Sequence, residues 1–271
     1  MGFFAVTGRS RPCPEDGGSS PQGVPLMIRE FRCDFHVHTC LSPCADLDMY
    51  PRAVVAMSIA RRLDIIAICD HNTSENVPYV IKSAKGTGLT VFPGMEIMSS
   101  EEVHVLALFD KQENLVMLQD LVYRHLPGKN DEERFGCQAI VNEHDEVEGL
   151  SERLLIGATV LPLQRIVDEI HGLGGLAIAA HIDRESFGLL GQLGFVPEGL
   201  PLDALEVSRR TGLAEARRRY PELARFPMIE SSDSHIIADI GKGVTRAFME
   251  EATTSELKMA FEKKSGRCIL E

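Results

Sequence analysis

The stretch CDFHVHTCLSPC, Cys33 to Cys44, places two histidines one residue apart in an otherwise apolar run. In a β-strand successive side chains point to opposite faces, so His36 and His38 share one face while Phe35 and Val37 share the other. Two imidazoles on one face can bind a metal ion, since neutral imidazole is a common ligand of zinc, iron and manganese. Two surface histidines on a half-exposed strand would give the same pattern, so the rest of the chain must decide.

The composition bounds the class of protein. At 271 residues the chain is long enough for one large α/β barrel. Its net charge of −12 disfavours extended binding to nucleic acid or anionic membranes, but it allows a compact phosphorylated substrate held by metal and arginines. The seven cysteines are scattered and odd in number, which indicates reduced thiols and a cytoplasmic location. No apolar run is long enough to predict a membrane span.

The chain divides into a tail and one domain. Residues 1–27 are rich in glycine, proline and serine and lack the apolar segment of a signal peptide, so we expect a disordered tail. The domain then covers residues 28–271. Within it, residues 111–159 interrupt the pattern with a helix and two charged stretches. We interpret them as an insertion, either a solvated surface excursion or a lid.

From Arg32 onward, short β-branched runs alternate with helical patterns, which indicates α/β units and a largely parallel sheet. The predicted strands are residues 31–38, 63–70, 89–96, 104–109, 175–181, 202–208 and 226–233. Helices are predicted over residues 51–62, 161–175 and 253–266. Thr254 or Ser255 should open the last helix and Gly266 should close it.

Nearly every predicted strand ends in a group that can bind a metal: His36 and His38, Asp70 and His71, Glu96, His181, and Asp233 and His235. In α/β barrels the C-terminal strand ends form the face on which active sites are built, so these residues should meet in space. His104 begins its strand and reaches the same face if residues 97–102 form a tight turn. With Asp46 added, the donors are too many for one ion. Imidazole and carboxylate together favour two or three zinc, manganese or iron ions, with a bridge such as Glu96.

Other polar residues near these motifs have simpler interpretations. Asp70 is expected to cap a helix or to orient His71 rather than to bind metal. Cys40 and Cys44 could add thiolates to a zinc site, but no second cysteine pair follows at ligand spacing, so we interpret both as packing residues. The remaining histidines lie in helical patterns or an acidic loop and are interpreted as residues without chemistry: His125, His144 and His171.

Five ordered motifs between about Arg32 and Ile240 resemble those of the PHP (polymerase and histidinol phosphatase) superfamily: DFHVHTCLSP, IAICDHNT, PGMEI with HVLALF, AAHIDR and SSDSH. The resemblance implies a distorted seven-stranded, TIM-like β/α barrel with a trinuclear metal site and phosphoesterase activity. It assigns His36, His38, Glu96 and Asp233 to the first metal, and Glu96, His104 and His181 to the second. It assigns His71 and His235 to the third, with an acidic or histidine residue of the first loop.

The first loop departs from the family pattern. HTCLSPCADLDMYP is several residues longer than the His-x-His-x-x-x-x-Asp-Gly of simpler members. Alignment on Pro51, which opens the next helix, selects Asp46 as the remaining ligand, with Asp48 as the rival. The family's Ala-His-Pro is AHIDR here, which keeps His181 but removes a rigid turn after it.

The resemblance predicts hydrolysis of a phosphate ester by a hydroxide that two or three metals activate. The expected substrate is a small nucleotide, sugar phosphate or amino-alcohol phosphate. Glu96, His181 and Asp233 would form the catalytic centre. Arg184, three residues after His181, is the first candidate for phosphate contact, ahead of Arg209, Arg210 and Lys242.

Two other classes remain open. An amidohydrolase-like enzyme also uses His-x-His on its first strand, but it commonly bridges its metals with a lysine. No lysine ends a strand here, and Glu96 takes that position. A metal-binding regulatory module without activity would be favoured if residues 111–159 plugged the barrel mouth.

Overall fold

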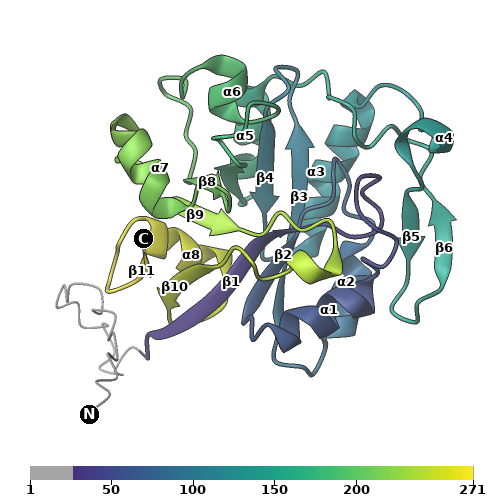
Figure 1. Cartoon of the computed structure of the whole chain (residues 1–271), viewed down its shortest axis with the longest axis horizontal. Coiled ribbons are helices and arrows are strands. Elements are labelled where there is room, and N and C mark those ends of the chain that lie inside the picture. The colour runs from purple at the N-terminus through teal and green to yellow at the C-terminus, as the bar shows by residue number, and fades with distance from the viewer. Residues whose placement is uncertain (1–26, 271) are drawn as a thin grey trace, which may run out of the picture.

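The computed structural model describes residues 27–270 (Figure 1). Apart from Met27, the predicted disordered tail lies outside the described residues. The chain forms a mixed α/β structure around one nine-stranded sheet, in the order β11-β10-β1-β2-β3-β4-β7-β8-β9. Among the described residues, no helix combines the length and hydropathy of a membrane span.

Seven of these strands form the barrel, and they correspond to the seven that the sequence predicts. They are β1 (Arg29–Val37), β2 (Ile65–Ile68), β3 (Thr90–Met98), β4 (His104–Leu108), β7 (Leu176–Ala179), β8 (Ala204–Ser208) and β9 (Met228–Ser231). The ring comes close to closing where β9 leads back to β1, because Val37 and Ser234 form a parallel bridge and His38 N donates to Ser234 O at 3.1 Å. The expectation of a distorted, TIM-like barrel is therefore confirmed.

Strand β4 runs against its neighbours. It pairs antiparallel with both β3 and β7, whereas the β1–β2, β2–β3, β7–β8 and β8–β9 pairs are parallel. The expectation of a largely parallel sheet is wrong at this strand, because residues 99–103 form a hairpin link too short for a crossover. The reversal brings the first residue of β4, His104, opposite Met98. His104 thus reaches the rim where the parallel strands end, as a tight turn would require.

A β-bulge changes the facing of residues in β1. The β1–β2 register shifts between Asp34 and Val37. Phe35 therefore packs in the inner apolar cluster, whereas Val37 packs in the outer cluster with the covering helices. The expectation that Phe35 and Val37 share a face is wrong, since an extra residue in a strand re-aims the side chains that follow it. His36 and His38 still share the inner face.

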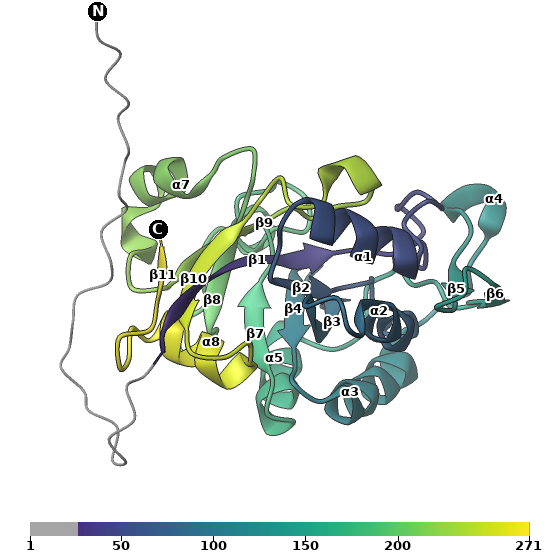
Figure 2. The ribbon, with the colours of Figure 1, turned by 90° about the horizontal axis from the view of Figure 1, so that it is seen from below.

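Helices cover the barrel (Figures 1 and 2). The larger ones are α1 (Pro51–Ala60), α2 (Val77–Ala84), α3 (Gln112–His125), α5 (Leu163–Gly172) and α8 (Thr254–Phe261). The shorter ones are α4 (Glu132–Phe135), α6 (Leu189–Leu193) and α7 (Leu213–Arg219), with 3₁₀ turns at Pro221–Leu223 and Ile237–Asp239. Leu257 and Phe261 of α8 join the inner cluster with Phe31, Phe35 and Phe92. This cluster fills the barrel on the side away from the histidines.

The C-terminal segment extends the sheet beyond β1. Strand β10 (Thr245–Met249) pairs antiparallel with β1, and β11 (Cys268–Leu270) pairs antiparallel with β10. Neither strand is among those predicted from the sequence. Helix α8 lies between them in the chain, and its cap is Thr253, whose hydroxyl accepts from Glu256 N. This cap is one residue before the two that the sequence suggested.

The segment expected to be an insertion has two parts. Helix α3 buries Leu115, Leu118 and Val122 in the outer cluster, so it belongs to the barrel wall. The alternation of strands and helices is interrupted only after α3. The interruption consists of α4 and the hairpin of β5 (Ala139–Val141) and β6 (Val147–Leu150). This hairpin lies at one side of the barrel (Figure 1), where Ala139 N donates to Cys40 O at 3.2 Å.

The cysteines differ in state. Cys33, Cys40, Cys44, Cys69 and Cys137 are free thiols. Cys268 is disulfide-bonded, so the expectation of reduced thiols is wrong for that residue.

Candidate metal centre

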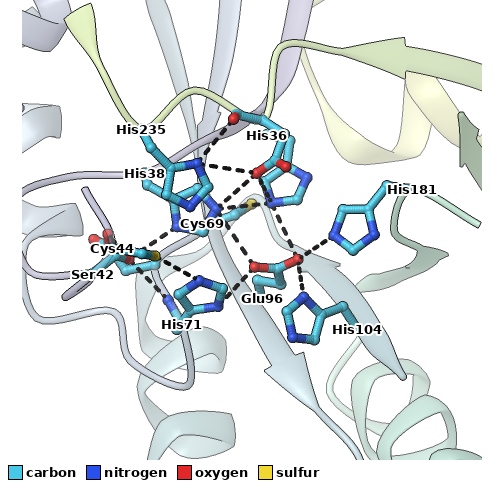
Figure 3. Close-up of polar contacts among 12 residues, drawn as sticks. His36, His38, Ser42, Cys44, Cys69, His71, Glu96, His104, His181 and His235 are labelled. Carbon is cyan, nitrogen blue, oxygen red and sulfur yellow. Dashed lines mark hydrogen bonds and ion pairs between the residues drawn. The ribbon is translucent and has the colours of Figure 1, made fainter. Parts of the chain in front are cut away.

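The two histidines at the end of β1 are held from behind by buried polar groups (Figure 3). His36 Nδ1 lies 3.0 Å from Glu206 Oε1 on β8, and His38 Nδ1 lies 2.9 Å from Ser42 Oγ. All four side chains are buried. A carboxylate or hydroxyl behind an imidazole fixes its tautomer and leaves the other nitrogen free to bind a metal. The Nε2 atoms of His36 and His38 do face each other, 3.1 Å apart.

Glu96 lies at the centre of the cluster, with imidazoles around its carboxylate (Figure 3). Its Oε1 is 2.7 Å from His104 Nδ1, 3.1 Å from His181 Nε2 and 3.4 Å from His36 Nε2. Its Oε2 is 2.9 Å from His71 Nδ1 and 3.5 Å from His38 Nε2. The two oxygens therefore face different sets of ligands, which is the arrangement that a bridging carboxylate requires.

The segment after β9 supplies the remaining members. Asp233 Oδ1 lies 3.2 Å from His38 Nε2 and 3.4 Å from His36 Nε2. His235 stacks on His38 with ring centroids 4.1 Å apart. Asp233 and His181 both have positive φ angles, 46° and 27°, which non-glycine residues seldom adopt and which cluster at functional sites.

The donor set fits metal ions. Three overlapping groups have ligand atoms within 4.8 Å of one another: His38, His71 and His235; His36, His38 and Asp233; His71, Glu96 and His104. Several buried atoms have no hydrogen-bond partner in the described structure, namely Glu96 Oε2, His104 Nε2 and His181 Nδ1. Glu96 Oε2 is close to His71 without hydrogen-bond geometry. A buried carboxylate oxygen without a partner is costly, and a cation at Glu96 Oε2 would satisfy it.

Charge coupling sets the protonation of the centre. Burial raises the pKa of Glu96, but the charges of His104, His36 and His71 outweigh it and hold the pKa well below its usual range. Burial likewise raises the pKa of Asp233. The charge of His36 and the hydrogen bond and charge of His38 outweigh this effect and hold the pKa well below its usual range. Both carboxylates are therefore ionised at neutral pH, which is the form that binds divalent metals.

Asp70 supports the centre from outside. It accepts from Thr39 N and Thr39 Oγ1, both at 2.7 Å, and from Ser42 Oγ at 2.7 Å. Ser42 in turn contacts His38 Nδ1 and the backbone N of His71. Asp70 belongs to none of the candidate metal groups of the described residues. It orients His71 and His38 through Ser42, in line with the predicted supporting role.

The first loop places Cys44, rather than the Asp46 side chain, against the cluster. Cys44 Sγ lies 3.2 Å from His71 Nε2. Asp46 is exposed and contacts the centre through its backbone, with its N donating to His235 O at 2.8 Å. Asp48 is exposed as well. Burial raises the pKa of the Cys44 thiol, but the charge of His71 and hydrogen bonds to His235 and His71 lower it to about 6.

Arg184 lies at the rim of the centre. Its guanidinium pairs with Asp233, and 45% of its side chain is exposed. Two of the other cations that the sequence suggested are engaged elsewhere, since Arg209 and Lys242 both pair with Asp239. His171 pairs with Asp203, and His125 and His144 have no contact with the cluster among the described interactions.

Sequence reasoning missed two contributors. Glu206 lies between apolar residues of a predicted strand. An ionisable side chain in such a buried run needs a polar partner, and this could have indicated that Glu206 belongs to the site. Cys44 gave a weaker signal, because its contact with His71 depends on the path of the first loop.

The model of the PHP domain family matches residues 34–185, more than half of the chain. The chain belongs to the PHP family. This PHP protein is thus a member of a superfamily of metal-dependent hydrolases. No curated protein sequence matches it.

Solved structures share the fold of this PHP protein. The lesion-specific endonuclease Q of Pyrococcus furiosus superposes with a TM-score of 0.70 at 15% identity, over 89% of this chain and 58% of that one. A Bifidobacterium adolescentis protein assigned as a metal-dependent phosphoesterase gives 0.50 at 18% identity, over 75% and 87%. An amidohydrolase from Chromobacterium violaceum gives 0.53 at 19% identity, over 77% and 89%. The chain therefore spans little more than half the length of the endonuclease.

Proposed function

We propose that this PHP protein is a metal-dependent phosphoesterase that acts on a small phosphorylated molecule. The observation that carries the proposal is the position of Glu96, whose two carboxylate oxygens face separate sets of imidazoles. Such a carboxylate holds two cations at a short separation, which is the arrangement that hydrolysis of phosphate esters uses.

The residues that we expect to hold the metals are those that the family resemblance assigns, and the contacts bring them into one cluster. His36, His38, Glu96 and Asp233 would hold one ion, Glu96, His104 and His181 a second, and His71 and His235 a third. When bound, the ions would neutralise phosphoryl oxygens and lower the pKa of water. Zinc, manganese and iron suit the mixture of imidazole and carboxylate.

The protein itself would position the substrate. Arg184 stands at the rim with nearly half of its side chain exposed, so its guanidinium can contact a non-bridging phosphate oxygen. Its pair with Asp233 places that contact beside the metal groups. Glu206 and Asp70 keep the imidazoles of β1 in one orientation, so the centre needs little rearrangement during reaction.

Cleavage of a nucleic-acid phosphodiester is the second candidate. The similarity to endonuclease Q, including its complex with a duplex that carries an abasic lesion, favours it. The net charge of −12 opposes it, because a polyanion is repelled by the average surface. A small substrate needs only the local positive charge of the centre, so it remains our first choice.

The test begins with metal analysis of the purified protein. It continues with a screen of phosphomonoesters, small diesters and abasic-site duplexes in the presence of zinc, manganese or iron. We expect turnover of a small ester. Cleavage of the duplex alone would make the protein a nuclease, amide or lactone cleavage would make it an amidohydrolase, and bound metal without turnover would indicate a regulatory module.

Glu96→Gln provides the matched variant, since it keeps the size of the side chain and removes its charge. We expect metal content and activity to fall together, because one bridging charge between two cations is lost. Full metal content at full rate in this variant would contradict the bridging role.

A further inference from the structure

A cysteine at the rim faces the outer histidines of the centre. His71 is buried, and its two nitrogens point to different partners. Nδ1 lies 2.9 Å from Glu96 Oε2, and Nε2 lies 3.2 Å from Cys44 Sγ. The same loop contacts His235, because Asp46 N donates to His235 O at 2.8 Å. Figure 3 shows Cys44 beside His71, on the side of the ring away from Glu96.

The third metal group lacks a carboxylate. His38, His71 and His235 form a group with ligand atoms within 4.8 Å, but His38 Nε2 also faces His36 and Asp233. An ion held by His71 Nε2 and His235 therefore needs another donor on the rim side. The sulfur of Cys44 occupies that side, whereas Asp46 turns its backbone N toward His235 O.

The loop that carries Cys44 is held in place at both ends. On one side Ser42 Oγ donates to Asp70, and Ala45 N donates to Ser42 O at 2.9 Å. On the other side Asp46 N donates to His235 O at 2.8 Å. Cys44 lies between these anchors, so the backbone that carries its side chain is fixed on both sides. Fixed ligands of this kind are typical of built metal sites.

We propose that Cys44 is a thiolate ligand of the ion that His71 and His235 hold. This inference rests on the proposed metal-dependent function and adds to it a mixed nitrogen and sulfur subsite. Three protein ligands leave one position open for water or a phosphate oxygen, as in catalytic zinc sites. A thiolate is a soft ligand, so this subsite selects zinc over manganese or magnesium.

The experiment measures ligation directly. The full-length protein is loaded with cobalt(II), and the near-ultraviolet absorption is recorded, where thiolate ligation gives an intense charge-transfer band that nitrogen and oxygen ligands do not give. X-ray absorption of the zinc-loaded protein should show a sulfur scatterer at about 2.3 Å. Both signals should disappear in Cys44→Ser, and its metal content should fall by about one ion per chain.

Two further variants make the outcome decisive. Cys137→Ser removes a free thiol that belongs to none of the candidate metal groups of the described residues, and it should keep both signals. Cys44→Asp supplies a carboxylate in place of sulfur. It should bind metal without a sulfur signal and should shift the preference of the subsite from zinc toward manganese.

Absence of a sulfur signal in the fully loaded wild type would overturn the proposal, and so would its persistence in Cys44→Ser. Ester turnover is assayed separately. A sulfur signal without turnover leaves the ligand assignment standing and contradicts the phosphoesterase. Turnover without a sulfur signal supports the phosphoesterase and contradicts the ligand assignment.

Discussion

At the scale of single residues, Glu206 contacts two of the expected metal ligands from the side away from the metal. Glu206 contacts His36 Nδ1 through both oxygens, at 3.0 and 3.2 Å, and its Oε1 accepts from His181 N at 3.1 Å. It therefore positions ligands of two expected metals. We predict that Glu206→Gln lowers zinc affinity about 10–100-fold, because a charged partner behind a ligating imidazole increases its basicity.

Competition with a chromophoric zinc chelator measures that affinity. Glu230→Gln is the matched control, since Glu230 lies on the neighbouring strand β9 and belongs to none of the described metal groups. Unchanged zinc affinity in Glu206→Gln would show that the contact with His36 is only structural.

Arg184 allows a second test at this scale. Replacing it by glutamine should lower kcat/KM for the phosphate ester about 100-fold, since one preorganised charged donor is removed from the transition state. Metal content should stay the same, because Arg184 pairs with Asp233 but is not itself a ligand. Arg218→Gln is the control, since Arg218 forms an exposed pair with Glu215 on α7. A large loss of metal in Arg184→Gln would reveal a structural role instead.

Residue types at strand ends made most of the centre predictable. His36, His38, His71, Glu96, His104, His181, Asp233 and His235 are brought together by the structure, because the strand ends of a barrel meet at one rim. The ligand expected from the first loop was harder to predict. Its identity depends on which side chain a long loop turns inward, and sequence spacing does not encode that.

At the scale of elements, the seven barrel strands were predictable because each is a short apolar run bounded by turn residues. The direction of β4 was not predictable from its pattern, since a buried strand reads the same in both directions. Strands β10 and β11 were missed for another reason. They flank the last helix as edge additions, and β11 has only three residues, Cys268–Leu270.

The residues around α4 and β5 contact the loop between β1 and α1, which we call the metal loop. Their charged sequence did not suggest this contact. Gly136, which ends α4, has a φ of 93°, and an added Cβ would lie 2.9 Å from Pro43 O. Asn76 Nδ2 joins the same area by donating to Ala139 O and Thr39 Oγ1. The residues around α4 and β5 therefore buttress the loop that carries Ser42 and Cys44.

We predict that Gly136→Ala destabilises the protein by ~1–3 kcal/mol, because alanine is strained at that φ and collides with the metal loop. Urea unfolding measures the change. Gly149→Ala on β6 is the control, since its added Cβ would meet nothing within 4 Å. It should change stability by less than about 0.5 kcal/mol. Equal effects of the two substitutions would show that the residues around α4 and β5 do not stabilise the metal loop.

At the scale of the whole molecule, the barrel encloses an apolar half and a polar half. The inner cluster of Phe31, Phe35 and Phe92 is sealed by α8, while the opposite rim gathers imidazoles and carboxylates in nearly complete burial. This division follows from the sequence, because ionisable residues stand at the ends of the parallel strands and His104 begins the antiparallel strand β4 at the same rim. Near-closure between β9 and β1 then brings the first and last motifs side by side.

Such a rim couples metal binding to folding, because residues of β1, β3 and β4 and of the segments after β1, β2, β7 and β9 converge there only in the folded state. We predict that chelation lowers the melting temperature and that zinc restores it. An ion at 100 times its Kd stabilises the folded state by about 2.7 kcal/mol. For a domain of this size that corresponds to roughly 5–10 °C. Calorimetry with and without chelator measures the shift, and Glu96→Gln should shift less because it begins with less metal. Equal melting temperatures after verified metal removal would mean that the rim is held by its own hydrogen bonds and that the unpartnered Glu96 Oε2 does not need a cation.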